Sequence, residues 1–220
     1  MGRKKLIFAT GNKGKLVEIR MIMSDIDVEV LSLKEAGINT EIIEDGMTFE
    51  ENAIIKAETI MKETGLLTLA DDSGLEVDFL NKEPGVYSAR YCGVNTSYRI
   101  KNRNIMERLT DVEDEQRTAR FVCAIAAAIP SGYYNGKDEN KVFEETDVIK
   151  TVRATMEGRI GYEERGTNGF GYDPIFFLPE YDCYSAELSL EEKNKISHRG
   201  KALRMMKELL ISEGIVGRLV

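Results

Sequence analysis

The sequence has little of several residue types that mark particular classes of protein. Its 220 residues include no tryptophan, one histidine and three cysteines. The cysteines, Cys92, Cys123 and Cys183, form no Cys-x-x-Cys pair, which argues against a disulfide framework and a zinc knuckle. We therefore expect a reducing, cytoplasmic environment. The single histidine, His198, also excludes a histidine-rich metal site.

Long apolar runs are missing as well. The longest, residues 121–129, is too short to cross a bilayer as a helix. Near the N-terminus only residues 6–9 form an uninterrupted apolar run, which is too short for a signal peptide.

The net charge is −8, and such a surface repels nucleic acid and anionic membrane, so we expect neither as a partner. An anionic ligand would need basic residues gathered locally.

Hydrophobic patterning predicts a mixed α/β protein. Strands are expected at 4–10, 28–33, 118–129, 142–156 and 175–178, and one more strand is expected to end at 71–72. Helices are expected at 15–24, 48–64 and 97–109, followed by a last helix capped by Ser197. Residues 130–140 read as a hairpin or loop tip. Since strands and helices interleave without strict βαβ regularity, we expect one domain over residues 1–220, with a mixed sheet, flanking helices and two lobes around a cleft.

Two adjacent carboxylates stand at the end of an apolar segment, in "LADDSGLEVDFL" (69–80). Repulsion and desolvation both oppose placing Asp71 beside Asp72, so we expect positive charge to compensate. Successive strand residues face opposite ways, so the two should differ in role, although spacing alone does not say which does what. A hard cation such as Mg²⁺ would suit one or two carboxylates, and "TEIIEDG" offers Glu41, Glu44 and Asp45 as further ligands. For an isolated Asp-Asp, a polar turn with Asx hydrogen bonds is the favoured explanation.

Basic residues gather at two predicted helix starts and on one helix shoulder. "TGNKGK" (10–15) leaves a strand and opens a helix, where backbone amides and lysines suit phosphate; an ordinary capped turn is the alternative. Asn52 and Lys56 lie four apart on the shoulder of the helix opened by the Thr48–Glu51 capping box, and could line a cleft. His198 and Arg199 open the last helix, against the usual preference for acids there.

A glycine-rich loop, "GTNGFGYDPIFF" (166–177), precedes a strand rather than a helix, which argues against a dinucleotide-binding fingerprint. Its Phe170 and Tyr172 are either core aromatics or a stacking platform for a base, with the glycines allowing close approach.

Six motifs in this order resemble the inosine/xanthosine triphosphate pyrophosphatases, enzymes that remove non-standard purine nucleotides: "TGNKGK", "FEENAIIKA", "LADDSGLEVD", "PGVYSARY", "GTNGFGYDPIFF" and "EEKNKISHRGKAL". The resemblance runs from residue 7 to about 210. It implies an elongated two-lobed α/β fold with a central cleft, a homodimer, and hydrolysis of ITP, dITP and XTP to monophosphate and pyrophosphate with one Mg²⁺ per subunit. Asn168 departs from the family, which more often has glycine there.

The resemblance also implies residue roles. Glu44 and Asp72 would hold magnesium, with Asp72 also the general base and Lys15 the catalytic phosphate lysine. The residues implied to bind substrate are Thr10, Gly11, Asn12, Lys13, Gly14, Lys15, Asn52 and Lys56 at the phosphates, and Ser73, Phe170, Gly171, Tyr172, Asp173, Lys193, His198 and Arg199 elsewhere on the nucleotide.

Two rival interpretations stay open from the sequence. One is a pyrophosphatase for modified pyrimidine or bulky nucleotides on a related fold, against which the "SHRG" and "GFGYDP" segments argue. The other is a non-catalytic nucleotide-binding protein, which would tolerate loss of Asp72 or Glu44; both residues are present.

Overall fold

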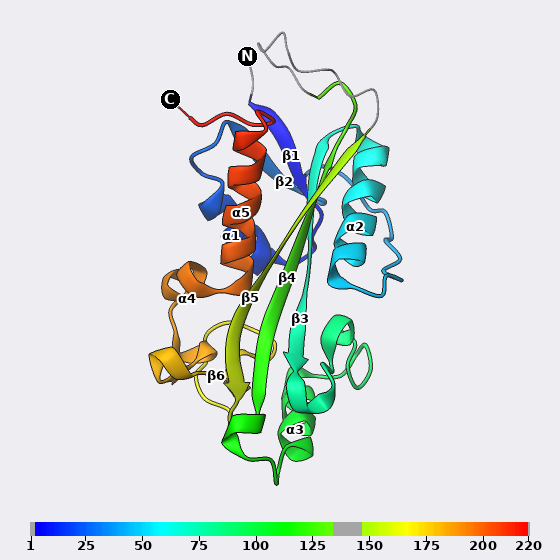
Figure 1. Ribbon diagram of the computed structural model, residues 1–220. Coiled ribbons are helices and arrows are strands. Elements are labelled where there is room, and N and C mark those ends of the chain that lie inside the picture. The colour runs from blue at the N-terminus through cyan, green and yellow to red at the C-terminus, as the bar shows by residue number, and fades with distance from the viewer. Residues whose placement is uncertain (1–2, 134–146, 220) are drawn as a thin grey trace. The chain divides into compact units, whose positions relative to one another are not determined.

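The computed structural model describes residues 3–133 and 147–219. The described chain forms a seven-stranded sheet with flanking helices (Figure 1). The strands are β1 (Lys4–Phe8), β2 (Val28–Ser32), β3 (Leu67–Val77), β4 (Thr118–Ile129), β5 (Val148–Ile160), β6 (Phe176–Leu178) and β7 (Cys183–Tyr184). The helices are α1 (Lys13–Ile22), α2 (Phe49–Thr64), α3 (Tyr98–Arg108), α4 (Leu190–Ile196) and α5 (His198–Ser212).

The sheet is mixed, which confirms the predicted fold class. Its strand order is β2-β1-β3-β4-β5-β6-β7. Strand β1 pairs in parallel with β2 and β3, whereas β6 pairs antiparallel with β5 and β7. The parallel part needs crossover connections, and these are the segments that carry α1 and α2.

The chain packs into two compact units. Unit 1 takes the described residues of Met1–Asp72, Ala124–Arg153 and Ala202–Val220, and unit 2 takes Ser73–Cys123 and Ala154–Lys201. Strands β3, β4 and β5 each contribute residues to both units. The expectations of one domain over 1–220 and of a central cleft stay predictions.

Unit 1 is built around the apolar end of β1, where Leu6, Ile7 and Phe8 are fully buried. Helix α2 begins with the predicted capping box, in which the Thr48 side chain accepts from the Glu51 amide and the Glu51 side chain accepts from the Thr48 amide. It ends at Gly65, whose left-handed backbone (φ +65°) suits glycine. In Figure 1, α2 lies on one side of the strands and α1 and α5 on the other.

The predicted apolar faces of two helices are buried. Helical spacing predicts that α2 has an apolar face, and all residues of this face are in the core: Phe49, Ala53, Ala57, Ile60 and Met61. On α5 four of the five predicted residues are buried, Ala202, Leu203, Met206 and Leu210, whereas Leu209 is only half-buried. The helical period therefore located both core-facing stripes.

Unit 2 has its own core. Leu75 and Val77 of β3 pack in one cluster with Ile105 of α3, Phe121 of β4 and Phe176 of β6. The sequence alternates apolar and polar residues after Gly74, which predicts that Leu75, Val77 and Phe79 share one face of a strand. This prediction is wrong at Phe79. Strand β3 ends at Val77 and residues 78–80 form a 3-10 turn, which leaves the Phe79 side chain exposed.

Several element ends differ from the predicted ones. Strand β1 ends at Phe8 rather than residue 10, and α1 begins at Lys13 rather than 15, because the Asn12 side chain caps it. Strand β5 extends to Ile160, beyond the predicted residue 156. The predicted strand residues 142–146, and residues 134–140 of the predicted hairpin or loop tip, lie outside the described residues.

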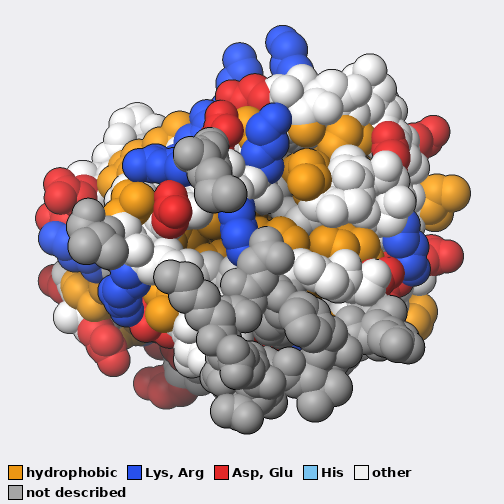
Figure 2. Space-filling view, turned by 90° about the horizontal axis from the view of Figure 1, so that it is seen from above, with side chains coloured by type: hydrophobic (Ala, Val, Ile, Leu, Met, Phe, Trp, Pro, Cys, Tyr) orange, Lys and Arg blue, Asp and Glu red, His pale blue; other side chains and the backbone are white. Residues whose placement is uncertain are grey.

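No helix within the described ranges is long and apolar enough to span a bilayer. On the face shown in Figure 2, the described acidic and basic side chains are interspersed with apolar ones.

A carboxylate in unit 2 makes stability depend on pH. Arg120 donates to both oxygens of Asp78 (2.9 and 3.0 Å), and Lys82 and Thr118 donate to the same carboxylate. Although burial opposes it, these donors hold the pKa of Asp78 far below its usual range. A carboxylate with a depressed folded-state pKa stabilises above its unfolded pKa of about 4, and this stabilisation is lost as pH falls through the folded-state pKa.

We therefore expect Asp78→Asn to lower the free energy of unfolding by about 1 kcal/mol at pH 7, since the network is only partly buried. The difference between variant and wild type should shrink steadily as the pH is lowered below about 4. Urea unfolding at a series of pH values measures it. A difference that is the same at pH 3 and pH 7 would contradict this assignment.

Candidate active site

The turn between β1 and α1 is an Asn-capped helix start. The Asn12 side chain accepts from the Gly14 amide (2.8 Å) and the Lys15 amide (3.3 Å), and Thr10 Oγ1 accepts from the Asn12 amide (3.1 Å). Lys13 is exposed, and α1 has no acidic residue in its first turn. The turn thus combines a helix N-terminus with two lysines, an arrangement that favours anions. The Asn12 side chain occupies the amides of Gly14 and Lys15, which confirms the capped turn. Phosphate binding at this turn stays a prediction.

The two adjacent carboxylates have different partners. Asp71 has a nearly inaccessible side chain and receives Lys15 Nζ at 3.1 and 2.9 Å from its two oxygens. Asp72 receives Lys56 Nζ at 3.2 Å. Each acid therefore has its own lysine, and the alternation of strand β3 separates the two pairs. This is the compensating positive charge that the sequence required.

Asp72 belongs to a small polar cluster in unit 1. Lys56 Nζ also contacts Glu44 Oε2 (3.1 Å), so one ammonium bridges both predicted metal ligands. Asn52 Nδ2 donates to Asp72 Oδ2 (3.3 Å), while Asn52 Oδ1 accepts from the Gly46 amide (2.9 Å). A Cβ on Gly46 would come within 2.7 Å of Asn52 Oδ1, so glycine is required for this close approach. The turn before α2 and the helix itself thereby fix one side of Asp72.

Burial and neighbouring charge set the protonation of this cluster. Burial opposes the charged form of Lys56, but the carboxylates of Asp72, Asp71 and Glu44 outweigh it and raise the pKa of the ammonium. Burial also raises the pKa of Asp72, against the opposing charge of Lys56. Burial and the Lys56 charge thus act in opposite directions on the Asp72 carboxyl, and burial has the larger effect.

The donor set of this cluster fits a hard divalent cation. Glu44 is partly exposed and Asp72 is half-buried, so both offer carboxylate oxygens. Within the described ranges no group of three or more His, Cys, Asp or Glu side chains could form an all-protein cage. Magnesium is normally held by one or two carboxylates and leaves its other positions to water and substrate phosphates. Two carboxylates therefore suffice.

A second group of predicted residues lies in unit 2, around the ring of Phe170. Lys193 Nζ and Arg199 Cζ stand 5.4 and 5.6 Å from the ring centroid, and the ring itself is partly exposed. An exposed aromatic with cations against it can also accept a flat ligand. Of the two sequence interpretations of this aromatic, core packing is wrong for Phe170.

Asp173 anchors the loop that carries Phe170. It is 2% exposed, and its carboxylate accepts from Lys193 Nζ (2.5 Å), the Phe170 amide (2.8 Å) and Ser185 Oγ (2.8 Å). Gly169 has φ +77°, and a Cβ there would collide with the Asp173 carboxylate. Glycine is therefore needed at this position, because the backbone passes close to the Asp173 carboxylate. Asp173 acts on the loop conformation, and a direct contact with substrate stays a prediction.

Tyr172 is a core residue rather than an exposed platform. Its ring is 3% exposed, its hydroxyl donates to the Ser88 carbonyl (2.7 Å), and Tyr98 packs edge-on against it at 5.2 Å. Burial raises the pKa of its hydroxyl well above the usual range. The predicted substrate contact of this side chain is therefore not supported. Its neighbour Gly171 has φ +73°, and a Cβ there would contact Tyr98.

His198 and Arg199 begin α5, as predicted. Ser197 Oγ accepts from the Gly200 amide (3.0 Å), which confirms the predicted cap. The His198 ring stacks on Phe121 at 5.0 Å, and Arg199 Nη2 lies 3.4 Å from Ser73 Oγ. Both side chains are buried, so they are held in fixed positions rather than free on the surface.

Sequence reasoning missed three participants. It did not separate Asp71 from Asp72 or identify the anchoring role of Asp71. It also gave no role to Phe121 beneath His198 or to Ser185 beside Asp173. Phe121 and Ser185 are a core aromatic and a buried serine, and neither type carries a signal of function in a single sequence.

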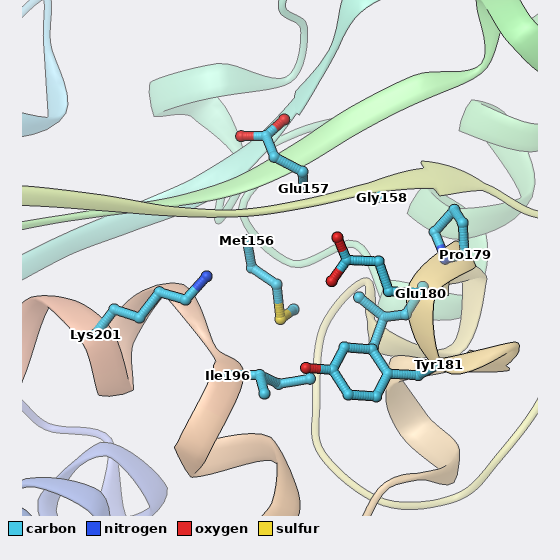
Figure 3. A pocket seen from close by; sticks show the side chains of 9 residues that line it. Met156, Glu157, Gly158, Pro179, Glu180, Tyr181, Ile196 and Lys201 are labelled. Atoms are coloured by element: carbon cyan, nitrogen blue, oxygen red, sulfur yellow. The ribbon is translucent and has the colours of Figure 1, made fainter.

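Unit 2 also contains a pocket that includes none of the predicted site residues (Figure 3). In that view Glu180 lies beside the ring of Tyr181, and Met156, Ile196 and Lys201 lie on the same side of β5, whereas the Glu157 side chain points to the other side of that strand. The carboxylate of Glu157 and the ammonium group of Lys201 already have protein partners. Arg120 Nε donates to Glu157 (3.0 Å), and Lys201 Nζ donates to the Thr155 carbonyl (3.2 Å).

The structure thus gathers the predicted residues into two groups. Those in unit 1 are Thr10, Gly11, Asn12, Lys13, Gly14, Lys15, Glu44, Asn52, Lys56 and Asp72. Those in unit 2 are Ser73, Phe170, Gly171, Tyr172, Asp173, Lys193, His198 and Arg199. Each group has internal contacts that make chemical sense, namely acids with lysines in the first and an aromatic with cations in the second.

Comparison with known proteins gives consistent results. Residues 6–209 match the Ham1 family. Relatives named dITP/XTP pyrophosphatase from Bacillus licheniformis and Bacillus subtilis are 48% and 46% identical over 207 residues, covering 94% of this chain and 98% and 97% of theirs. The solved Ham1 protein of Staphylococcus aureus is 38% identical with a TM-score of 0.81, covering 96% of this chain and 100% of its own. The chain is therefore a member of the Ham1 family.

Proposed function

We propose that this chain hydrolyses non-standard purine nucleoside triphosphates, namely ITP, dITP and XTP, to the monophosphate and pyrophosphate, and so cleanses the nucleotide pool. The observation that carries the proposal is the cluster in unit 1, in which Lys15 and Lys56 meet Asp71, Asp72 and Glu44. Lysines paired with acids are suited to a metal-bound triphosphate, because the acids can hold the metal and the lysines can bind phosphate. The proposal is further supported by relatives that are named dITP/XTP pyrophosphatase.

The phosphates would be held by the turn of residues 10–15 and by the lysines. Backbone amides at the start of α1 favour negative charge, and Lys13 is exposed beside them. Lys15 is oriented by Asp71, which fixes the direction of its ammonium group. Asn52 and Lys56 would contact phosphate from α2. The acidic protein would thus present a locally basic surface to its anionic substrate.

A magnesium ion, one per subunit, would be held by Glu44 and Asp72. When bound, it would stabilise negative charge on the phosphoryl oxygens. We propose it because the two carboxylates form a suitable donor set, as argued above. Removal of divalent cations with EDTA should therefore abolish hydrolysis, and added Mg²⁺ should restore it.

Asp72 would act as the general base. It would take a proton from water as the water oxygen forms a bond to the α-phosphorus and the bond from that phosphorus to the bridging oxygen breaks. Pyrophosphate leaves with the electrons of that bond.

Selectivity for the base would come from hydrogen-bond donors in unit 2. Inosine and xanthosine carry a 6-oxo group, whereas adenosine presents an amino donor. Arg199 and a protonated or suitably tautomeric His198 are donors, so they would pair with the oxo group and reject the amino group. A buried donor left unpaired costs about 1–3 kcal/mol, or roughly 5- to 150-fold. Phe170 would stack on the base.

Guanosine shares the 6-oxo group, so it must be rejected at position 2 of the purine. We expect Arg199 to contribute, because a donor there suits the 2-oxo group of xanthosine and disfavours the 2-amino group. Arg199→Ala should lower the ratio of kcat/KM for XTP to that for GTP by about tenfold. Parallel kinetics with both nucleotides measure the ratio, with Arg204→Ala on the same helix as the control. An unchanged ratio would remove Arg199 from the selectivity mechanism.

A substrate panel tests the whole proposal. Pyrophosphate release should be fast with ITP, dITP and XTP, slow with GTP and ATP, and absent without a divalent cation. Preferential hydrolysis of modified pyrimidine nucleotides would favour the rival enzyme class. Tight binding of ITP without any release of pyrophosphate would favour a non-catalytic nucleotide-binding protein.

Two further expectations accompany this proposal. We propose a homodimer, on the basis of family resemblance, and light scattering on the purified protein tests it. We also propose a cytoplasmic location, which is supported by three free cysteines, one of them exposed, among the described residues.

A further inference from the structure

The ammonium group of Lys56 stands between the two carboxylates proposed to hold the metal. Lys56 comes from the middle of α2, is 8% exposed, and places Nζ 3.1 Å from Glu44 Oε2 and 3.2 Å from Asp72 Oδ1. Glu44 precedes α2 in the sequence and Asp72 lies on β3, so this one side chain links three parts of unit 1. An ammonium group in this position neutralises the same charge that a divalent cation would neutralise.

We propose that Lys56 is an internal counter-ion that competes with the divalent cation for Glu44 and Asp72, so that metal binds tightly only when a triphosphate offers Lys56 another partner. The inference rests on the proposed function, because it takes these two carboxylates as the metal ligands. It adds a role for Lys56 before substrate arrives, distinct from its proposed contact with phosphate.

Electrostatic repulsion makes the Lys56 ammonium group and a divalent cation compete for Glu44 and Asp72. An ammonium group in hydrogen-bond contact with a carboxylate repels a divalent ion bound to the same carboxylate, and partial burial keeps that repulsion from being screened by salt. Lys56 Nζ lies within hydrogen-bond distance of both carboxylates, so a divalent ion bound to them would stand close to the ammonium group. Metal binding therefore requires the ammonium group to move away from Glu44 and Asp72.

The surrounding contacts make Lys56 the partner that moves. Asp72 is fixed on its other oxygen by Asn52, and Asn52 is in turn fixed by the Gly46 amide. Lys56 reaches the acids through a flexible four-carbon stem, which can swing without disturbing the helix. A triphosphate brings several negative charges, so it gives Lys56 a new partner as the metal takes its place.

Unit 1 contains an internal comparison for this idea. Lys15 is also held by a carboxylate, but its partner is the buried Asp71 rather than either proposed metal ligand. Lys15→Met and Lys56→Met remove the same charge from the same unit. Only the second removes a competitor from Glu44 and Asp72.

The test is a titration with Mn²⁺ alone, without nucleotide, in which electron paramagnetic resonance counts the free ion. Full-length wild type, Lys56→Met and Lys15→Met are compared, with circular dichroism confirming that each is folded; Lys56→Gln replaces Lys56→Met if the latter does not fold. We expect Lys56→Met to bind Mn²⁺ about tenfold or more tighter than wild type, and Lys15→Met to differ from wild type by no more than about threefold.

Two results would overturn the inference. One is a Lys56→Met variant that binds Mn²⁺ no tighter than wild type. The other is an equal gain in Lys15→Met, which would reveal a general charge effect. The double variant Lys56→Met/Asp72→Asn separates this failure from failure of the metal assignment. It should lose the added affinity, and if it keeps that affinity, Asp72 is not a metal ligand and the proposed metal site is itself wrong.

Discussion

Replacing Asp72 by asparagine is expected to slow pyrophosphate release from ITP by about 10²- to 10⁴-fold, the usual contribution of a positioned general base. Asparagine keeps the size of the side chain but cannot accept the proton of the attacking water. It also removes one of the two carboxylates proposed to hold magnesium. Excess Mg²⁺ can offset weaker metal binding but cannot replace the missing base, so it should not restore the rate. Steady-state kinetics over a range of Mg²⁺ concentrations measures both effects.

The matched control is Asp78→Asn, the same substitution six residues further along the chain. Asp78 is held by Arg120, Lys82 and Thr118, and none of these three is a predicted site residue. Its variant should hydrolyse ITP at the wild-type rate despite its lower stability. An Asp72→Asn enzyme that turns over within tenfold of wild type would show that the base lies elsewhere.

Most helices and strands could be predicted because each has a characteristic hydrophobic period in the sequence. The faces of α2 and α5 follow the helical repeat, and the caps at Thr48 and Ser197 follow known hydrogen-bond chemistry. The failure at Phe79 has a physical cause. Residues 78–80 turn immediately after β3, and alternation alone cannot show where a strand ends.

The pairing of charges was beyond sequence reasoning. Nothing in "LADDSG" shows that Asp71 meets Lys15 across 56 positions while Asp72 meets Lys56.

The partners of Arg117 were even less predictable from the sequence. It is almost fully buried, and its guanidinium donates to the carbonyl oxygens of Leu109, Ile160 and Gly161. An arginine that satisfies backbone carbonyls rather than an acid has no signature in one sequence, because its partners are peptide groups that every residue possesses.

Asp173 gives the prediction with the largest expected effect on stability. Its carboxylate is the acceptor for Lys193, for Ser185 and for the Phe170 amide, all in unit 2. Asp173→Ala would leave the buried Lys193 ammonium without its carboxylate, and removing one member of a buried ion pair typically costs about 3–5 kcal/mol. Urea unfolding should show a loss of that size, and the KM for ITP should rise because the Phe170 loop is no longer anchored.

The double variant Asp173→Ala/Lys193→Met identifies the cause. With the uncompensated ammonium removed, it should recover a substantial part of the lost free energy of unfolding, since an apolar pair in place of a buried ion pair is often tolerated. The KM for ITP should stay high, because the Phe170 amide still lacks its acceptor. If Asp173 instead only contacts substrate, as family resemblance implies, Asp173→Ala would raise KM while leaving stability unchanged. The unfolding experiment therefore separates the two roles, because one predicts a loss of stability and the other predicts no change.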